Sequence, residues 1–341
     1  MIKSQQNFDL SERNTFAMPV KCGCFMEYDS REDIPFVLST IRPDIDIFHI
    51  GAGSNLLFTS DYPGVVLHSL IRGMDIVGTG PDHVLVRVGA GETMDSFIEW
   101  ACQRELWGVE NLSGIPGEAG AAAVQNVGAY GAEAADAIES VEAFDRSQGE
   151  FVIISRDECR YAYRDSLFKR PSLKGSYIIS SVTFRLSTVA RPNISYSALA
   201  GMFASHAPES PMEVRKAVIA IRDSKLPDPA KVPSAGSFFK NPEVDRSVFD
   251  SIARAEGGEE AVPHYLLPDG RVKIPAAWLI DRCGWKGHEE ENVAVWHLQP
   301  LVIVNPRRTA TPSEVVGLEK RIVASVKSRF GITLVPEVEH I

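Results

Sequence analysis

Two glycine-rich segments of this chain have residue types and a spacing that indicate a binding function. Residues 51–57 have the sequence Gly-Ala-Gly-Ser-Asn-Leu-Leu after an apolar run, and residues 114–131 contain five glycines among many alanines. Glycine lets a backbone approach a phosphate closely, and successive N–H groups form an anion-binding concavity. Tight turns and a flexible linker are the alternative interpretations. Two such segments in one half of the chain favour a large cofactor that contains a pyrophosphate.

Polar side chains also occur at positions where a core would be apolar. Tyr163 and Arg164 suit a carboxylate or phosphate ligand, although a surface salt bridge is the commoner use of such an arginine. Glu337 follows a proline near the end of the chain. It is an ordinary surface acid unless the chain end folds back over a pocket.

Ser237 precedes two phenylalanines and a lysine, which suits the wall of a substrate pocket. A buried, hydrogen-bonded serine can donate a proton, and a turn-forming serine is the alternative. No His–Asp partnership and no Gly-x-Ser-x-Gly motif accompanies it, so a serine hydrolase is not supported.

Charge and composition exclude several classes of protein. The 341 residues include 35 Lys+Arg and 45 Asp+Glu, a formal net charge of −10, which argues against a nucleic-acid or membrane-surface binder. An anionic ligand would need a locally basic pocket. No apolar stretch approaches ~18 residues and no signal segment is recognisable, so we expect a soluble cytoplasmic protein. The five cysteines lack zinc-ligand spacing, so we expect no metal site.

The apolar pattern indicates an alternating α/β chain. Strands are predicted at residues 45–50, 64–70, 84–88, 140–144, 151–154, 177–186, 300–305 and 332–335. A helix is predicted over residues 93–106, and capping motifs at Ser210 and Thr311 predict two more. Residues 187–211 are rich in proline and serine, which predicts a linker or mobile loop and a domain boundary near 200–225. Residues 51–57 lack the third glycine of the dinucleotide fingerprint, so a Rossmann domain is not expected.

Taken together, these segments resemble the UDP-N-acetylenolpyruvoylglucosamine reductase family (UDP-N-acetylmuramate dehydrogenases) of bacterial peptidoglycan synthesis. The resemblance runs from Asn14-Thr15-Phe16 to Pro336-Glu337-Val338. Its markers are residues 51–57, 114–131, 163–166, 235–242 and 276–281. Each motif is modest alone, but their joint order and spacing are specific. Residues 192–196 resemble the extra loop of the type I members, in which Tyr196 would close over the nucleotide sugar.

The resemblance implies an α+β fold with two domains. Residues 1–205 would form a two-lobed FAD-binding domain of the vanillyl-alcohol-oxidase (PCMH) type, with lobes at about 1–70 and 71–205. Residues 206–341 would form an α/β substrate-binding domain, with the C-terminal segment returning to the active site.

The same resemblance implies non-covalent FAD, because neither glycine-rich segment contains a histidine that could attach it. NADPH would reduce the flavin, and UDP-N-acetylglucosamine enolpyruvate would then accept a hydride from flavin N5 at its C3. The residues implied to bind FAD are Gly51, Ala52, Gly53, Ser54, Asn55, Leu56, Gly114, Ile115, Pro116, Gly117, Gln125, Asn126, Gly128, Ala129 and Tyr130.

Three residues receive catalytic roles from the resemblance. Ser237 would protonate C2 of the substrate, and Arg164 and Glu337 would stabilise the enolic carboxylate formed after hydride transfer. The residues implied to bind the substrate are Tyr163, Tyr196, Lys225, Asn241, Tyr265, Lys273 and Gln299. NADPH and the UDP-sugar are then the small-molecule partners, no nucleic acid or membrane partner is expected, and a monomer is predicted.

Two other functions remain as alternatives. A different flavin oxidoreductase would share the FAD segments but not the Ser237 and Glu337 segments. A non-redox nucleotide-sugar binding protein would use the glycines for phosphates and purify without colour. Flavin colour therefore separates the second alternative from both flavoenzymes.

Overall fold

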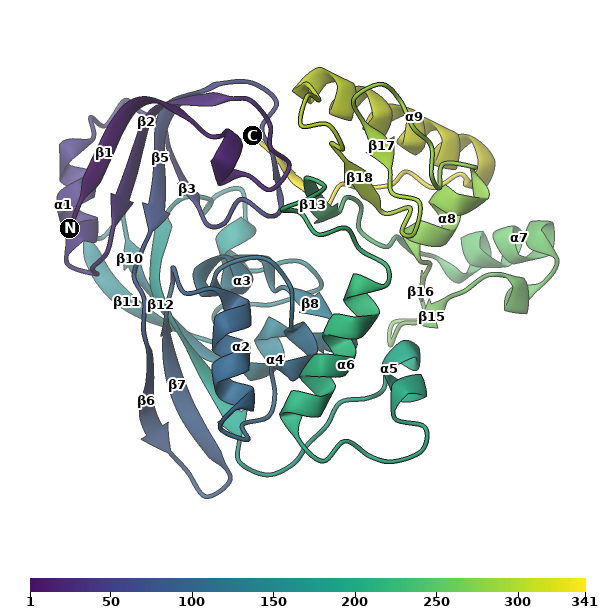
Figure 1. The fold of residues 1–341 in the computed structure, drawn as a ribbon, viewed down its shortest axis with the longest axis horizontal. Helices are drawn as coiled ribbons and strands as arrows, with labels where there is room; N and C mark the ends of the chain where they lie inside the picture. The colour runs from purple at the N-terminus through teal and green to yellow at the C-terminus, as the bar shows by residue number, and fades with distance from the viewer. The chain divides into compact units, whose positions relative to one another are not determined.

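Apolar, β-branched runs near the N-terminus form a four-stranded sheet in the computed structural model, which describes residues 1–341 (Figure 1). The strand order is β1-β2-β5-β3, with β2 and β3 each parallel to β5. The strands are β1 (Lys3–Asp9), β2 (Lys21–Tyr28), β3 (Ile47–Ile50) and β5 (Tyr62–Ser69). Helix α1 (Asp33–Thr40) buries Ile34 and Val37 in one cluster with Leu67 of β5. The strands predicted at residues 45–50 and 64–70 are confirmed.

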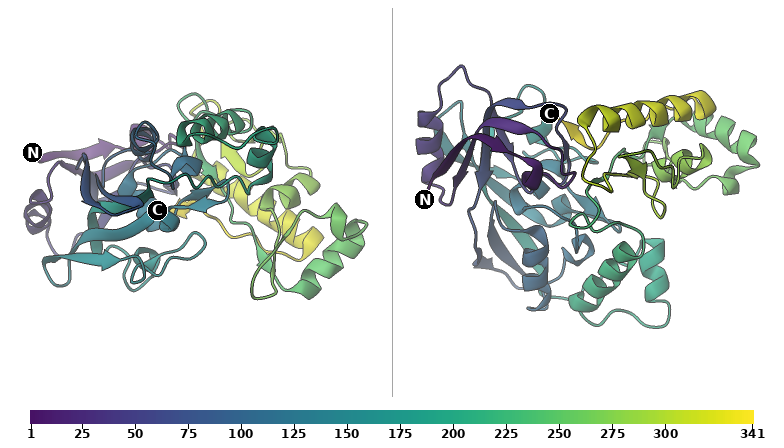
Figure 2. Two further views of the ribbon diagram at one scale, coloured as in Figure 1. Left: turned by 90° about the horizontal axis from the view of Figure 1, so that it is seen from below. Right: turned by 45° about the horizontal axis from the view of Figure 1, so that its top comes forward.

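A second sheet of five antiparallel strands follows along the chain (Figures 1 and 2). Its order is β11-β10-β12-β7-β6. The strands are β6 (Met74–Thr79), β7 (His83–Gly89), β10 (Ile138–Asp145), β11 (Glu150–Ser155) and β12 (Tyr177–Ser187), which confirms the four strands predicted in this region. In β7, Val86 and Val88 are buried whereas Arg87 between them is exposed. This two-residue alternation is typical of a sheet with one packed face.

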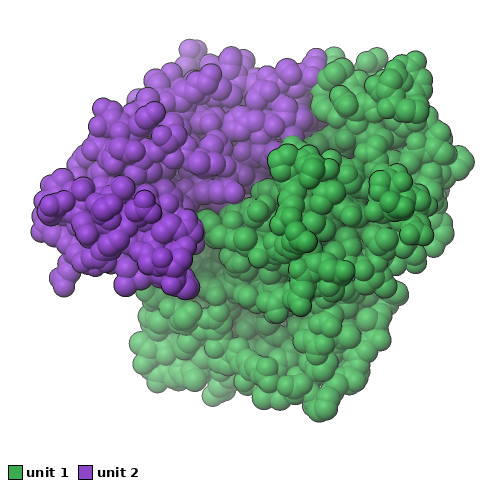
Figure 3. Space-filling model, turned by 180° about the vertical axis from the view of Figure 1, so that it is seen from behind, with its two compact units in different colours: residues 1–8, 21–52, 62–223 green, residues 9–20, 53–61, 224–341 purple.

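The chain divides into two compact units, coloured separately in Figure 3. Unit 1 comprises residues 1–8, 21–52 and 62–223, and unit 2 comprises residues 9–20, 53–61 and 224–341. The two sheets described above build unit 1. The division into an FAD-binding domain (residues 1–205) and a substrate-binding domain (residues 206–341) stays a prediction. None of the helices combines the length and apolar character needed to cross a bilayer.

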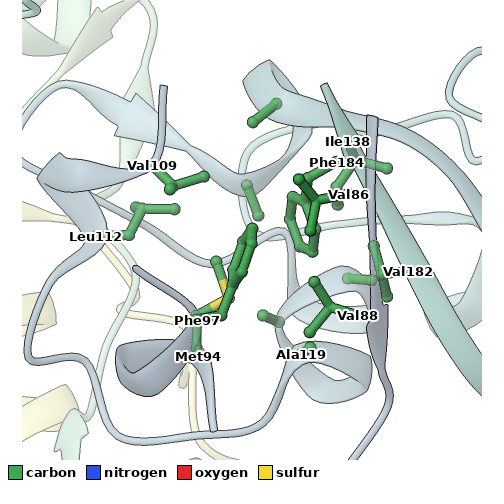
Figure 4. Close-up of a cluster of buried hydrophobic side chains, with 14 of the residues drawn as sticks. Val86, Val88, Met94, Phe97, Val109, Leu112, Ala119, Ile138, Val182 and Phe184 are labelled. Carbon is green, nitrogen blue, oxygen red and sulfur yellow. The ribbon is translucent and has the colours of Figure 1, made fainter. Parts of the chain in front are cut away.

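The main core of unit 1 lies between the five-stranded sheet and the helices α2 (Met94–Cys102), α3 (Ala119–Gln125) and α4 (Ala134–Ala137). Figure 4 shows Phe97 of α2 facing Phe184 of β12, and the two ring centroids are 4.6 Å apart. A Cβ on Gly120 would lie only 3.0 Å from the Cβ of Ala90, so small residues allow α3 to approach the sheet closely. Helix α2 confirms the helix predicted from Thr93, which caps it.

Two segments predicted to be irregular contain helices. Residues 114–131 include α3, because the run of alanines is strongly helix-forming and outweighs the glycines on either side. Residues 187–211 include α5 (Ser197–Met202), which buries Leu199. The hairpin strands β8 (Gly128–Ala129) and β9 (Ala132–Glu133) follow α3. Short 3-10 helices occur at η1 (Ser11–Arg13), η2 (Glu110–Leu112), η3 (Leu167–Lys169) and η4 (Glu259–Ala261).

Helix α6 (Pro211–Asp223) begins where the sequence predicts, but its capping box is incomplete. The Glu213 N–H donates to Ser210 Oγ at 3.3 Å, whereas the Glu213 carboxylate accepts from the Glu209 N–H at 2.8 Å. The predicted apolar face is buried and consists of Val214, Ala217, Val218 and Ile221. It packs in one cluster with α5 and Trp107.

Unit 2 contains two small antiparallel sheets, with strand orders β13-β18-β17 and β14-β16-β15. The strands are β13 (Ser234–Ser237), β14 (Glu243–Val244), β15 (Tyr265–Leu266), β16 (Val272–Lys273), β17 (Ala294–Val295) and β18 (Val302–Val304). The helices are α7 (Arg246–Glu256), α8 (Ala276–Arg282) and α9 (Pro312–Phe330), the long yellow helix in Figure 2. Strand β18 confirms the strand predicted at residues 300–305. The predicted capping box of Thr311 and Glu314 is complete in α9.

The strand predicted at residues 332–335 is wrong, because these residues have no regular structure. Val335 accepts a hydrogen bond from the Lys240 N–H at 2.9 Å, but pairing with this segment is limited to a single bridge between Phe239 and Pro336. The regular pairing lies further on, where β19 (Glu339–His340) runs parallel to β4 (Leu56–Leu57).

Helix α3 ends at Asn126, which has a left-handed φ of 45°. Its buried side chain makes three hydrogen bonds. Nδ2 donates to Glu133 Oε2 at 2.7 Å and to the Ala162 carbonyl at 2.9 Å, and Oδ1 accepts from the Ala135 N–H at 3.0 Å. Asn126 therefore connects the end of α3 to α4 and to the segment that carries Arg164.

Replacing Asn126 with alanine should lower the free energy of unfolding by about 3 kcal/mol, because each lost hydrogen bond costs about 1 kcal/mol. Urea unfolding followed by circular dichroism measures this loss. Asn7→Ala is the matched control, because Asn7 is exposed and also left-handed, with a φ of 50°. A loss no greater than that of Asn7→Ala would contradict the connecting role of Asn126.

Candidate functional site

The start of the first glycine-rich segment lies against the second within unit 1. A Cβ built on Gly51 would lie 3.0 Å from the Cβ of Ala121 and 3.3 Å from Oε2 of Glu118. Gly114 and Gly117 have φ values of 70° and 143°, which other residues avoid. Residues from both predicted cofactor-binding segments are therefore neighbours, and glycine is needed where they meet.

Gly114 is held by hydrogen bonds at both its N–H and its carbonyl. The N–H donates to Asp95 Oδ1 at 2.6 Å, and the carbonyl accepts from Arg222 Nε at 3.1 Å. Arg215 forms a bidentate ion pair with Asp95, with Nη2 2.9 Å from Oδ2, and this pair lowers the pKa of Asp95. Burial lowers the pKa of the Arg222 guanidinium. Both arginines come from helix α6.

Tyr130 and Tyr196, predicted to bind the cofactor and the substrate respectively, pack edge to face with ring centroids 5.3 Å apart. Asn111 Nδ2 donates to the Tyr130 carbonyl at 2.7 Å and to the Asn193 carbonyl at 2.8 Å. Burial raises the pKa of Tyr130. The proline-punctuated segment before Tyr196 is thus attached to the end of the second glycine-rich segment.

Arg164, the predicted catalytic arginine, lies beside this same segment. Its Nη2 donates to the Gly128 carbonyl at 2.6 Å, and its guanidinium carbon lies 5.2 Å from the centroid of the Tyr163 ring. Lys169 Nζ donates to the Arg164 carbonyl and to Gln125 Oε1, both at 3.2 Å. Unit 1 therefore brings Tyr163 and Arg164 together with Gln125 and Gly128 of the predicted cofactor site.

Unit 2 brings together the two other predicted catalytic residues, Ser237 and Glu337. The Glu337 N–H donates to the Phe238 carbonyl at 2.8 Å, and Phe239 forms an antiparallel bridge with Pro336. Ser237 is exposed at the end of β13, whereas the two phenylalanine side chains after it are buried. The aromatic pair thus anchors the strand next to an accessible hydroxyl.

Asn55 of the first glycine-rich segment lies next to Glu337 in unit 2. Asn55 Nδ2 donates to the Glu337 carbonyl at 3.1 Å, and the Asn55 carbonyl accepts from the Glu339 N–H at 3.0 Å. The parallel pairing of β4 and β19 continues this contact. The end of the chain therefore lies beside both Asn55 and the Ser237 segment.

The predicted substrate-binding residues of unit 2 occupy several positions. Tyr265 and Lys273 are cross-strand partners in β15 and β16, and Lys273 Nζ lies 3.1 Å from Glu243 Oε1. Asn241 Oδ1 accepts a hydrogen bond from the Ala276 N–H at 2.9 Å, at the start of α8. The remaining two make local contacts: the Lys225 carbonyl accepts from Trp296 Nε1 at 3.1 Å, and Gln299 Oε1 accepts from the Leu301 N–H at 3.4 Å.

The other predicted cofactor-binding residues are divided between the units. Unit 1 contains Ala52, Ile115, Pro116 and Ala129, and unit 2 contains Gly53, Ser54 and Leu56. Gly53 has a φ of 64°, and a Cβ there would lie 2.2 Å from the Arg13 carbonyl, so glycine is required. The Thr15 N–H donates to the Gly53 carbonyl at 3.1 Å.

Three residues that hold Gly114 directly or through Asp95 were not predicted from the sequence: Arg215, Arg222 and Asp95. The available signal was two arginines in a helix whose other buried positions are apolar, since a buried arginine requires polar partners. Cofactor binding by Asn126 stays a prediction, and its side chain makes hydrogen bonds within the protein.

Two family models match the chain. Residues 24–155 match the FAD binding domain, and residues 228–341 match the C-terminal domain of UDP-N-acetylenolpyruvoylglucosamine reductase. The chain is also similar to a solved structure of UDP-N-acetylenolpyruvylglucosamine reductase from Thermus caldophilus, with a TM-score of 0.69 and 23% identity, covering 100% of this chain and 98% of that one. These matches confirm the predicted fold class.

Two curated relatives carry the same name over nearly their full length. The reductase of Bacteroides fragilis (strain YCH46) is 44% identical over 337 residues, covering 99% of this chain and 100% of the relative. The reductase of Porphyromonas gingivalis (strain W83) is 40% identical over 339 residues, covering 99% of both chains. At this identity and coverage, the chain belongs to the UDP-N-acetylenolpyruvoylglucosamine reductase family.

Proposed function

We propose that this protein is an FAD-dependent oxidoreductase that reduces UDP-N-acetylglucosamine enolpyruvate to UDP-N-acetylmuramate in peptidoglycan precursor synthesis. The observation that carries the proposal is 44% identity over the full length of a relative with that reductase name. The FAD binding domain at residues 24–155 supports the cofactor. We further propose NADPH as the hydride donor, a cytoplasmic location and a monomeric state.

The residues of the two glycine-rich segments fit FAD. Gly51 packs where a Cβ would be crowded by Ala121 and Glu118, and Gly114 and Gly117 adopt positive φ. Backbone of this kind lets a pyrophosphate approach closely, because no side chain intervenes. Bound FAD would supply the hydride for the reaction.

We assign the proton and charge chemistry to three residues. Ser237 donates the proton to C2 of the substrate. Its side chain is exposed at the end of β13, unlike the buried serine considered from the sequence, and this exposure leaves the hydroxyl accessible to a substrate. Arg164 and Glu337 stabilise the negative charge that develops on the substrate carboxylate. The hydrogen bond from the Arg164 guanidinium to the Gly128 carbonyl supports the preorganisation of Arg164. The hydrogen bond from the Glu337 N–H to the Phe238 carbonyl supports that of Glu337.

Substrate binding is assigned to the remaining predicted residues, Tyr163, Tyr196, Lys225, Asn241, Tyr265, Lys273 and Gln299. The lysines are suited to the diphosphate and the tyrosines to stacking on the nucleotide sugar. Tyr265 is 56% exposed, which leaves its ring accessible to a ligand.

An anaerobic flavin spectrum tests the proposed function. NADPH should bleach the flavin band of the purified protein, and UDP-N-acetylglucosamine enolpyruvate should restore it. A flavin that bleaches but stays reduced would retain the cofactor and exclude this substrate. A protein that binds no FAD after reconstitution would contradict the proposal and favour a nucleotide-sugar binding protein.

Replacing Ser237 with alanine should slow formation of UDP-N-acetylmuramate by on the order of a hundredfold, because the proton donor is lost. The rate of bleaching by NADPH should be unchanged. Chromatographic product analysis measures the first step, and stopped-flow absorbance measures the second. Ser247→Ala is the matched control, since Ser247 is an exposed serine on α7 of the same unit. Equal slowing of both steps would show general damage and exclude the proton-donor role.

A further inference from the structure

A buried ionisable group in unit 1 lies outside all the predicted site residues. His68 of β5 is 6% exposed and has a carboxylate at each ring nitrogen. Its Nδ1 lies 3.1 Å from Glu27 Oε1, and its Nε2 lies 2.9 Å from Glu118 Oε1. Both glutamates are also buried, at 9% and 6% exposure.

The hydrogen-bond chemistry of this trio determines its charge. A neutral imidazole has one N–H and can donate to only one carboxylate, whereas an imidazolium donates to both. With both glutamates ionised, a neutral ring would therefore direct a lone pair at one buried carboxylate. The imidazolium form of His68 satisfies both hydrogen bonds and reduces the local charge to −1.

The other titratable groups that face His68 are compatible with a cation there. His49 of β3 is buried, and burial together with the charge of His68 lowers the pKa of His49 to about 4, so that it is neutral. The hydroxyl oxygen of Tyr28 in β2 lies 2.6 Å from His49 Nε2, and burial raises the pKa of Tyr28. Neither group competes with His68 for the carboxylates.

Glu118 connects the trio to the glycine-rich segments. It immediately precedes α3, and its Oε2 lies 3.3 Å from the position of a Cβ on Gly51. The Glu118 carboxylate therefore contacts His68 through Oε1, and its Oε2 lies close to Gly51 of the first glycine-rich segment. The backbone of Glu118 belongs to the second segment.

We infer that His68 is a positioning residue for FAD: as an imidazolium between Glu27 and Glu118, it fixes the Glu118 carboxylate beneath Gly51 and so holds the two glycine-rich segments together. The inference rests on the proposed function in one respect, that these segments bind FAD. His68 itself does not touch the reacting atoms.

Three variants test this role through the dissociation constant of FAD, measured by quenching of flavin fluorescence on adding apoprotein. His68→Gln can donate to only one carboxylate, and should weaken FAD binding by at least about tenfold. In Glu118→Gln, a neutral His68 donates to Glu27 and accepts from the new amide, so FAD binding should weaken less than in His68→Gln. The double variant H68Q/E118Q restores a complete chain of donors and acceptors, and should recover to within about threefold of Glu118→Gln.

His83→Gln is the matched control for the loss of a histidine. His83 is also in a strand of unit 1 and contacts a carboxylate, Asp82, but its side chain is 23% exposed. FAD binding should be unchanged. Affinity in His68→Gln equal to wild type, or a double variant as weak as His68→Gln, would overturn the inference.

Nitrogen chemical shifts of selectively labelled histidine provide a readout that a purely structural role would not alter. At about pH 8, where an unperturbed histidine is neutral, both ring nitrogens of His68 should be protonated in wild-type protein, and only one in Glu118→Gln. A single N–H in the wild type would overturn the inference. Because the spectrum is recorded on apoprotein, it decides the state of His68 even if His68→Gln does not fold. Failure of wild-type protein to bind FAD would contradict the proposed function instead.

Discussion

The main-chain pairing of the C-terminal segment is the interaction on which the candidate site of unit 2 depends. The hydrogen bond from the Glu337 N–H to the Phe238 carbonyl, together with the bond from Asn55 Nδ2 to the Glu337 carbonyl, joins three distant parts of the chain. Because this pairing uses backbone groups of Phe238 and Glu337, it sets the spacing of the Ser237 and Glu337 backbones whatever their side chains. The buried side chains of Phe238 and Phe239 then keep the two backbones at this spacing, because a closely packed interior resists displacement.

In unit 1 the corresponding constraint is the close approach of backbone segments that have little side chain of their own. Helix α3 of the second glycine-rich segment packs in the main core, and polar contacts fix the backbone on either side of it. Asp95 and Arg222 hold Gly114, Asn126 holds the end of α3, and Asn111 holds Tyr130. Buried networks of this kind specify one arrangement because a partly satisfied alternative leaves polar groups unpaired.

Much of this arrangement could be predicted from the sequence, and the failures have physical causes. The apolar run of β7 and the capping box at Thr311 can be recognised from neighbouring residues alone, and both were predicted correctly. The helix within residues 114–131 was missed because glycines at its ends obscured the alanines. Residues 332–335 have a strand-like composition, but a strand needs a partner, and pairing here is limited to the single bridge between Phe239 and Pro336. The two arginines of α6 act through tertiary contacts that have no local sequence pattern.

An acidic chain with a net charge of −10 can bind an anionic dinucleotide only if charge is arranged locally. Arginines in unit 1 meet this need by an indirect route as well as by their own charge. Arg164 and Arg222 donate to the carbonyls of Gly128 and Gly114. A carbonyl engaged by a guanidinium no longer presents its negative end to a phosphate. The two guanidinium groups therefore add positive charge beside the proposed FAD site and also mask the carbonyls that would repel a phosphate.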